Sequence, residues 1–167
     1  MKIRPETPQD ISAIEKITIA AFDGKPYSDK TEHLIVNRLR QAGAMSVSLV
    51  AEIDGKVVGH VAFSVVTING EDIGWYGLGP VSITPELQKQ GIGSKLIREG
   101  LTIIKAKGAK GCALEGSPEY YQRFGFKAYP GLFYEGAPAP EYFMALPFYN
   151  DIPKGKVEFH RAFYTNT

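Results

Sequence analysis

The stretch Gln88-Lys89-Gln90-Gly91-Ile92-Gly93-Ser94 places two glycines where a predicted strand gives way to a predicted helix. Glycine lets the backbone turn tightly and approach a ligand closely. The first N–H groups of a helix have no partner inside the helix, and together with the helix dipole they bind phosphate or pyrophosphate. The stretch is therefore a candidate phosphate-binding loop, although the glycines would also suit a purely structural strand-to-helix turn.

The sequence lacks the motifs of two other kinds of phosphate-binding loop. The Walker loop, GxxxxGK[ST], is absent from the chain. The dinucleotide fingerprint GxGxxG would need glycine where Leu96 stands, and the upstream Gly77-Leu78-Gly79 fails because Ser82 follows. A nucleotide-binding module is therefore disfavoured.

Upstream of the loop, the pattern of the sequence is that of strands joined by hairpins. Apolar and polar residues alternate over residues 47–53, and Asp54-Gly55 is a strong hairpin signal. Residues 57–68 form the expected return strand, Asn69-Gly70 marks a second hairpin, and residues 73–83 form the next strand. These three strands are predicted to form an antiparallel meander.

The last strand of this meander is interrupted by Gly77, Gly79 and Pro80. Proline cannot donate to a strand ladder and glycine weakens a strand, so a bulge is expected here. A bulge would separate this strand from its next neighbour.

Helix signals and further strands surround the meander. Thr7 and Pro8 begin a helix, Asp29 with Glu32 resembles a capping box for a second helix ending near Gly43, and a long helix is expected from Gly91 to Lys107. The remaining expected elements are strands at 1–4, 111–114, 126–133, 141–148 and 156–160, and a short helix at 118–124 ended by Gly125.

This mixed order predicts an α+β fold with a central, mixed but mostly antiparallel sheet, splayed at a bulged fourth strand and flanked by helices. A length of 167 residues fits a single domain over residues 1–167. We expect its core at about residues 3–148 and a C-terminal extension at 149–167.

The composition excludes several classes of protein. Hydrophobic residues make up 44% and charged residues 22%, which excludes a disordered chain. With 19 Lys and Arg against 18 Asp and Glu there is no basic field for nucleic acid or a membrane surface. The single cysteine, Cys112, excludes an internal disulfide and CxxC zinc sites, and no metal is expected. Apolar runs are too short for a membrane helix and the start lacks a signal-peptide core, so we expect a cytoplasmic protein.

Three segments together resemble the GNAT superfamily of N-acetyltransferases. The loop matches its Q/R-x-x-G-x-G/A signature, residues 78–85 resemble the strand that precedes the signature, and residues 121–126 resemble the Y-x-x-x-G-F segment that follows it. The order of elements agrees with that of the superfamily from Ile3 to about Phe148. The sequence of residues 119–126 is most similar to the bacterial YhbS-like branch.

The resemblance implies acetyl-coenzyme A as co-substrate. It implies that the pyrophosphate is bound mainly by the backbone of Gln88, Lys89, Gln90, Gly91, Ile92, Gly93 and Ser94. Val81, Ser82 and Ile83 would pair with the pantetheine arm like an added strand, and one N–H there would polarise the thioester carbonyl. Core packing is the alternative role for Val81 and Ile83, and Lys89, Lys95 or Arg123 could contact phosphates.

Tyr121 corresponds to the general acid of the family. A phenol with a reference pKa of about 10 is protonated at neutral pH and can protonate a departing thiolate. The alternative is that Tyr121 only packs a short helix. An asparagine that contacts the cofactor in many relatives has no counterpart in Leu114-Glu115-Gly116-Ser117.

No motif identifies a general base. Glu32, His33, His60, Glu71, Asp72 and Glu115 are candidates, beside a water-mediated base or an amine that arrives neutral. His60 is expected to be a core histidine, and Cys112, in an apolar strand, is expected to pack rather than to carry an acetyl group.

The predicted activity is transfer of an acetyl group to the amine of a small molecule or peptide by direct attack in a ternary complex. The alternative is a non-catalytic coenzyme A-binding sensor or assembly module. The aromatic and proline-rich residues 129–149 would line an acceptor pocket or form the contact of a homodimer.

Overall fold

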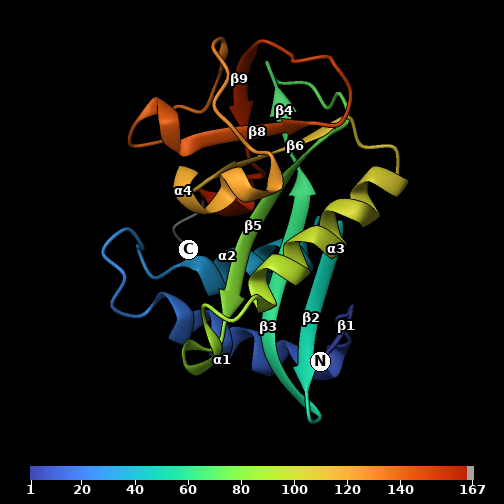
Figure 1. Ribbon diagram of the computed structural model, residues 1–167, viewed down its shortest axis with the longest axis vertical. Coiled ribbons are helices and arrows are strands. Elements are labelled where there is room, and N and C mark those ends of the chain that lie inside the picture. Colours follow the sequence, from blue (N-terminus) through green and yellow to red (C-terminus); the bar gives the residue numbers. More distant parts are fainter. Residues whose placement is uncertain (165–167) are drawn as a thin grey trace. The chain divides into compact units, whose positions relative to one another are not determined.

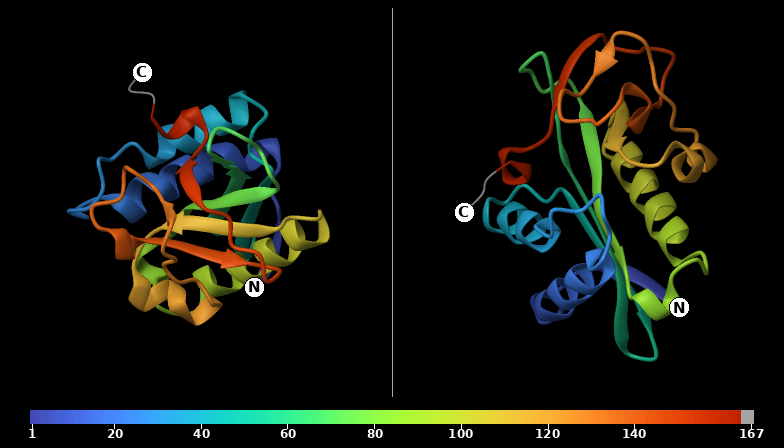
Figure 2. Two further views of the ribbon diagram at one scale, coloured as in Figure 1. Left: turned by 90° about the horizontal axis from the view of Figure 1, so that it is seen from above. Right: turned by 90° about the vertical axis from the view of Figure 1, so that its left-hand side faces the viewer.

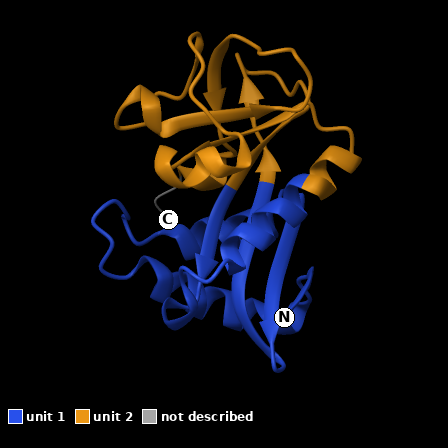
Figure 3. Cartoon of the chain, in the orientation of Figure 1, with its two compact units in different colours: residues 1–63, 79–101 blue, residues 64–78, 102–167 orange. Residues whose placement is uncertain are grey.

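The computed structural model describes residues 1–164 and divides into two compact units (Figure 3). Unit 1 contains residues 1–63 and 79–101, and unit 2 contains residues 64–78 and the chain from Thr102 onward. Strand β3 (Lys56–Val65), strand β5 (Trp75–Ile83) and helix α3 (Ile92–Ala106) each contribute residues to both units.

The main sheet has six strands in the order β1-β2-β3-β5-β6-β8 (Figure 1). Strands β1–β2, β2–β3 and β6–β8 pair antiparallel, and β5–β6 pair parallel. This confirms the expected mixed, mostly antiparallel sheet. The bounds not yet given are β1 Lys2–Pro5, β2 Val47–Ile53, β6 Gly111–Glu115 and β8 Phe143–Pro147.

In unit 1, helices cover both faces of the strands (Figure 2). Helices α1 (Ile11–Phe22) and α2 (Glu32–Gln41) lie on one face, where Ile14 and Val36 pack against Val50 of β2. The first turns of α3 lie on the other face. The expected hairpin between β2 and β3 is confirmed, because Asp54 and Gly55 both have the positive φ that its turn requires (50° and 79°).

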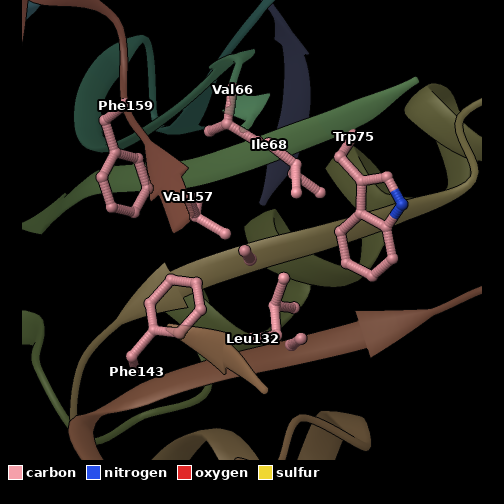
Figure 4. Packing of buried hydrophobic residues seen from close by; sticks show 9 residues of the cluster. Val66, Ile68, Trp75, Leu132, Phe143, Val157 and Phe159 are labelled. Atoms are coloured by element: carbon pink, nitrogen blue, oxygen red, sulfur yellow. The ribbon is translucent and has the colours of Figure 1, made fainter. Parts of the chain in front are cut away.

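Unit 2 has its own apolar core (Figure 4). A small second sheet adds to it, in the order β4-β9-β7, with β4 at Thr67–Ile68, β9 at Gly155–Glu158 and β7 at Leu132–Phe133. Val157 of β9 and Phe159 belong to this core. The expected C-terminal strand is therefore present, and the expected C-terminal extension contributes Val157 and Phe159 to the packing of unit 2, while its residues 165–167 lie outside the described residues.

Strand β5 is the expected interrupted strand, the fourth of the sequence-based count. Gly79 has φ of 129°, and the peptide bond between Gly79 and Pro80 is cis. Parallel pairing with β6 joins Trp75–Gly77 to Gly111–Ala113, whereas β6 pairs with β8 along all five of its residues. The pairing between β5 and β6 thus stops just before the irregular Gly79-Pro80 step.

Two expected strands were wrong in extent. Residues 57–68 are not one strand, because the chain leaves β3 after Val65 and Ile68 pairs instead with Val157 of β9. Only the last two residues of 126–133 are a strand. Pro130 lacks an N–H and Gly131 is left-handed (φ 88°), so the chain turns there, with Leu132 N–H bonded to Tyr129 O at 3.3 Å.

The expected capping box at Asp29 was also wrong. Helix α2 begins at Glu32 and Thr31 is its N-cap. The Asp29 carboxylate instead accepts hydrogen bonds from the N–H and hydroxyl of Thr31, and the Ser28 hydroxyl donates to Glu32 at 2.7 Å. Local polar contacts shift the helix start by two residues.

No helix in the described chain combines the length and apolarity needed to cross a membrane. Within residues 1–164 no cluster of three or more His, Cys, Asp or Glu side chains is arranged to hold a metal ion.

Candidate active site

The candidate phosphate-binding loop lies between β5 and α3 in unit 1, after a short 3₁₀ turn at Pro85–Leu87. Lys89 and Gly91 both have positive φ, 64° and 88°, so two residues of the loop adopt a left-handed conformation before the helix begins. Lys95 N–H bonds Gly91 O at 3.1 Å and is the first link of the helix ladder. The N–H groups of Ile92, Gly93 and Ser94 precede that link, so they are the helix donors available to a ligand.

Side chains of the loop hold its shape. The Gln88 amide donates to Ile83 O at 3.0 Å, which ties the loop to the end of β5. The Gln90 amide donates to Glu86 O at 3.5 Å, and the Lys89 side chain is exposed. A Cβ added at Gly91 would meet no atom within 4 Å, so the space beside this residue is open.

The second half of β5 directs its side chains into the protein. The Ser82 hydroxyl is buried and donates to Thr18 of α1 at 3.2 Å. Ile83 points to the opposite face, where its Cδ1 lies 2.8 Å from the position of a Cβ on Gly59, beside Ile92 of α3. Ser82 is buried and Val81 and Ile83 are partly buried, so the backbone of Val81–Ile83 is the part that a ligand could pair with.

Gly59 was missed in the sequence analysis although it stands inside a strand. A Cβ there would be 2.8 Å from Ile83 and 3.1 Å from Leu96. The absence of a side chain at Gly59 lets α3 pack closely against β3. Gly59 therefore helps to set the distance between the sheet and the helix that follows the loop.

Tyr121 lies in unit 2, at the end of the short helix α4 (Pro118–Tyr121). Its N–H bonds Ser117 O at 3.0 Å, and its ring stands edge-on to Tyr120 and Phe126, with centroids 4.9 and 6.2 Å away. A Cβ on Gly116 would lie 2.5 Å from Cε2 of the Tyr121 ring. The ring therefore lies directly on the backbone of Gly116, just after β6.

Gly116 is a second residue that sequence reasoning missed. Its segment was noted only because it lacks the asparagine of many relatives. The structure shows that glycine at this position makes room for the Tyr121 ring. The signal was a glycine directly after a strand and five residues before the candidate acid.

A family model described as an acetyltransferase (GNAT) domain matches residues 2–129. The chain belongs to the GNAT family. It is 37% identical to the uncharacterized N-acetyltransferase YhbS of Escherichia coli strain K12 over 128 residues, covering 76% of this chain and 74% of that protein. It is 32% identical to the uncharacterized N-acetyltransferase YjhQ of the same strain, covering 78% of this chain and 71% of that one.

Solved structures agree with this family. A GNAT family acetyltransferase from Brucella melitensis, in complex with acetyl-CoA, is 51% identical with a TM-score of 0.87, and 97% of each chain is covered. YhbS from Escherichia coli, in complex with CoA, is 30% identical with a TM-score of 0.89, covering 99% of this chain and 93% of that one. The expected family, the YhbS-like branch and the α+β fold are confirmed.

Tyr120, the neighbour of the candidate acid in this GNAT chain, is held differently. The Arg123 guanidinium lies 4.4 Å from the centre of the Tyr120 ring, and Arg123 Nε donates to Tyr120 O at 2.8 Å. The side chain of Arg123, which we named as a possible phosphate contact, therefore interacts with Tyr120 in the preceding turn of the same helical segment. Tyr120 is a suitable control for Tyr121.

His60, a candidate base, is part of a buried polar network in unit 1. Its side chain is fully buried, and its Nε2 lies 2.8 Å from the Ser48 hydroxyl, which also contacts the Glu6 carboxylate. Arg40 donates to both oxygens of Glu6 at 2.8 and 2.9 Å. Burial lowers the pKa of His60 to about 4, so the imidazole is neutral at pH 7. His60 is buried, as expected for a core histidine, but its Nδ1 has no hydrogen-bond partner among the described residues, and its structural role stays a prediction.

The other candidate bases differ in how firmly they are held. The Glu32 carboxylate accepts a hydrogen bond from the Ser28 hydroxyl, and Asp72 accepts one from Gly74 N–H at 3.0 Å in the turn before β5. Glu71 is exposed in that turn, and His33 is partly exposed on α2. Glu115, the last residue of β6, has a pKa raised by desolvation.

Cys112 is fully buried in β6, and its pKa is raised by burial. A thiolate is the nucleophilic form of cysteine, so raising the pKa disfavours an acetyl-cysteine intermediate.

Proposed function

We propose that this GNAT chain is an acetyl-CoA-dependent N-acetyltransferase that moves an acetyl group to the amine of its acceptor by direct attack in a ternary complex. The observation that carries the proposal is the start of α3. Three helix N–H groups follow the left-handed Gly91, and the space beside that glycine is open. Converging N–H donors at the positive end of a 15-residue helix suit a pyrophosphate.

Two relatives support acetyl-CoA as the co-substrate. The Brucella melitensis protein is described in complex with acetyl-CoA and the Escherichia coli YhbS protein in complex with CoA. We infer that Gln88–Ser94 bind the pyrophosphate and that the backbone of Val81–Ile83 pairs with the pantetheine arm. The buried Ser82 side chain, which donates to Thr18, is consistent with this division, because it points away from the ligand and leaves backbone groups to it.

The proposed reaction needs one proton at the leaving group. The neutral amine attacks the thioester carbonyl carbon, a C–N bond forms, and the C–S bond breaks. Backbone N–H groups of β5 would stabilise the oxyanion. Tyr121 donates its phenolic proton to the departing thiolate, the attached nitrogen loses one proton to water, and solvent restores the proton of Tyr121.

The test has two stages. Isothermal titration calorimetry with acetyl-CoA, NAD and ATP should show binding of acetyl-CoA, and tighter binding of NAD would refute the loop assignment. Thiol release from acetyl-CoA is then measured with a panel of primary amines. Binding of acetyl-CoA without release with any amine would favour the non-catalytic sensor or assembly module.

A further inference from the structure

An open hollow of about 290 Å³ lies in unit 2, beside the end of strand β8. None of its lining residues belongs to the loop or to the β5 residues that we assign to acetyl-CoA. Its volume is at the lower end of the range of small-molecule sites, so it suits a ligand with a single ring rather than a peptide segment. The hollow is lined by three aromatic rings, two further apolar side chains and one amide, from Tyr129, Phe148, Tyr149, Pro147, Ile152 and Asn150.

Backbone hydrogen bonds hold the two walls of the hollow in place. On one side, Lys127 exchanges hydrogen bonds of 3.1 and 2.8 Å with Ala145 of β8, and Tyr129, two residues further on, packs against the unit 2 core. On the other side, Phe148 N–H donates to Lys110 O at 2.9 Å. The rings that line the hollow are therefore positioned by the fold before any ligand binds.

Two ammonium groups lie beside these rings. Lys105 Nζ is 5.5 Å from the centre of the Phe148 ring, and Lys127 Nζ is 5.3 Å from the centre of the Tyr129 ring. The face of an aromatic ring attracts a cation, so the two charges are kept at the hollow. Neither ammonium forms an ion pair with another residue of the described chain.

Positive charge exceeds negative charge around the hollow. The segments 127–131 and 147–154 carry Lys127 and Lys154 against one carboxylate, Asp151, and Lys105 adds a third positive charge. The stem of Lys154 reaches the Tyr129 side, because its Cγ lies 3.4 Å from the position of a Cβ on Gly131. Such surroundings favour an anionic ligand and disfavour an ammonium group, so the hollow does not suit the amine acceptor of the proposed reaction.

We propose that this hollow binds a small aromatic anion, a single ring that carries a carboxylate or phosphate group, at a site separate from that of acetyl-CoA. The ring packs against Tyr129, Phe148 and Tyr149, in the edge-on or offset arrangements that aromatic pairs prefer. The anionic group lies beside the ammonium groups of Lys105 and Lys127, each of which can donate a charge-assisted hydrogen bond.

The test uses 3-phenylpropionate and its neutral analogue 3-phenylpropanamide. Ligand-observed NMR with the whole protein should give a dissociation constant on the order of 1 mM for the acid and weaker binding of the amide. The double variant Lys105→Gln/Lys127→Gln changes two exposed side chains and should weaken the acid roughly fivefold while leaving the amide unaffected. Lys16→Gln, at an exposed lysine of α1, is the matched control and should bind both probes as wild type does.

A second variant tests the ring contacts. Tyr149→Ser removes a ring that is 61% exposed, so the fold should be kept, and both probes should bind more weakly. Tyr27→Ser, at a tyrosine that is 77% exposed in unit 1, is its control and should leave the affinity of both probes unchanged.

The titration of wild type is repeated with saturating acetyl-CoA, which itself contains an aromatic ring and phosphates. Unchanged affinity for 3-phenylpropionate is expected, because the two sites share no residue. Displacement of 3-phenylpropionate by acetyl-CoA would assign the probe to the acetyl-CoA site and overturn the inference. Absence of binding, equal affinity for acid and amide, or an equal loss of both probes in the double lysine variant would also overturn it.

Discussion

A methyl group at Gly116 should disable the enzyme by moving Tyr121. The added Cβ would lie 2.5 Å and 2.9 Å from two carbons of the Tyr121 ring. Normal carbon contacts are about 3.5–4.0 Å, so the ring must move by about 1 Å. Gly116 has no left-handed φ, so alanine fits its backbone and the ring bears the change.

The expected loss follows from this displacement. A misplacement of about 1 Å can cost roughly 10²-fold in rate, or about 2.7 kcal/mol of barrier. Gly116→Ala should therefore lower kcat about 10²-fold, close to the loss expected for Tyr121→Phe, which removes only the hydroxyl of the proposed acid. The dissociation constant of acetyl-CoA should stay near wild type. Crowding of the ring should lower the free energy of unfolding by about 1–3 kcal/mol, so rates are measured well below the melting temperature.

A double-mutant cycle shows whether Gly116 acts through Tyr121. Wild type, both single variants and the double variant are assayed by thiol release under conditions where chemistry limits the rate. If both changes remove the same acid, the double variant should be no worse than about 10²-fold below wild type. Tyr120→Phe is the control and should keep its kcat. Turnover of Gly116→Ala within about threefold of wild type, or losses that multiply in the double variant, would refute the reasoning.

Three further predictions follow from the loop, the buried histidine and the cysteine. Gly93→Val should raise the dissociation constant of acetyl-CoA at least tenfold in calorimetry, because a branched side chain obstructs the N–H donors at the start of α3. The control Glu99→Val, in the same helix, should leave this constant unchanged. An equal dissociation constant for wild type and Gly93→Val would mean that the loop is only structural. Burial lowers the folded pKa of His60 to about 4, against 6.5 when unfolded, so its stabilising contribution is complete above pH 6.5 and falls by about 3 kcal/mol toward pH 4. Urea unfolding should show a shallower pH dependence for His60→Gln, and an unchanged slope would contradict the assignment. Buried Cys112 should stay unreactive toward a disulfide reagent in the native protein, and Cys112→Ala should keep the kcat of wild type. Rapid labelling of Cys112, or loss of turnover in a folded Cys112→Ala variant, would favour an acetyl-cysteine intermediate.

Predictions based on local sequence patterns were correct at several positions in this chain. The hairpin turn at Asp54-Gly55 and the end of the helical segment at Gly125 were predicted correctly, because each depends on a backbone conformation that a few neighbouring residues decide. Tyr121 was singled out by its motif, and the structure adds the glycine on which it lies.

Errors arose where partners come from far along the chain. Residues 57–68 look like one strand, but Ile68 pairs with Val157, some ninety residues away in the sequence. Residues 126–133 have the composition of a strand, yet most of them have no continuous strand partner among the described residues.

By itself the sequence determined the GNAT family, the order of elements and the loop at Gln88–Ser94, since these depend on short-range patterns and backbone preferences. Only the tertiary structure decided that the Ser48 hydroxyl contacts both His60 and Glu6, and that the Tyr121 ring lies on Gly116. Each of these depends on which side chains meet across strands and helices, and on how much water is removed from the groups that meet. Periodicity predicts that a residue is buried, whereas its partners, and hence its charge and chemistry, are decided by packing.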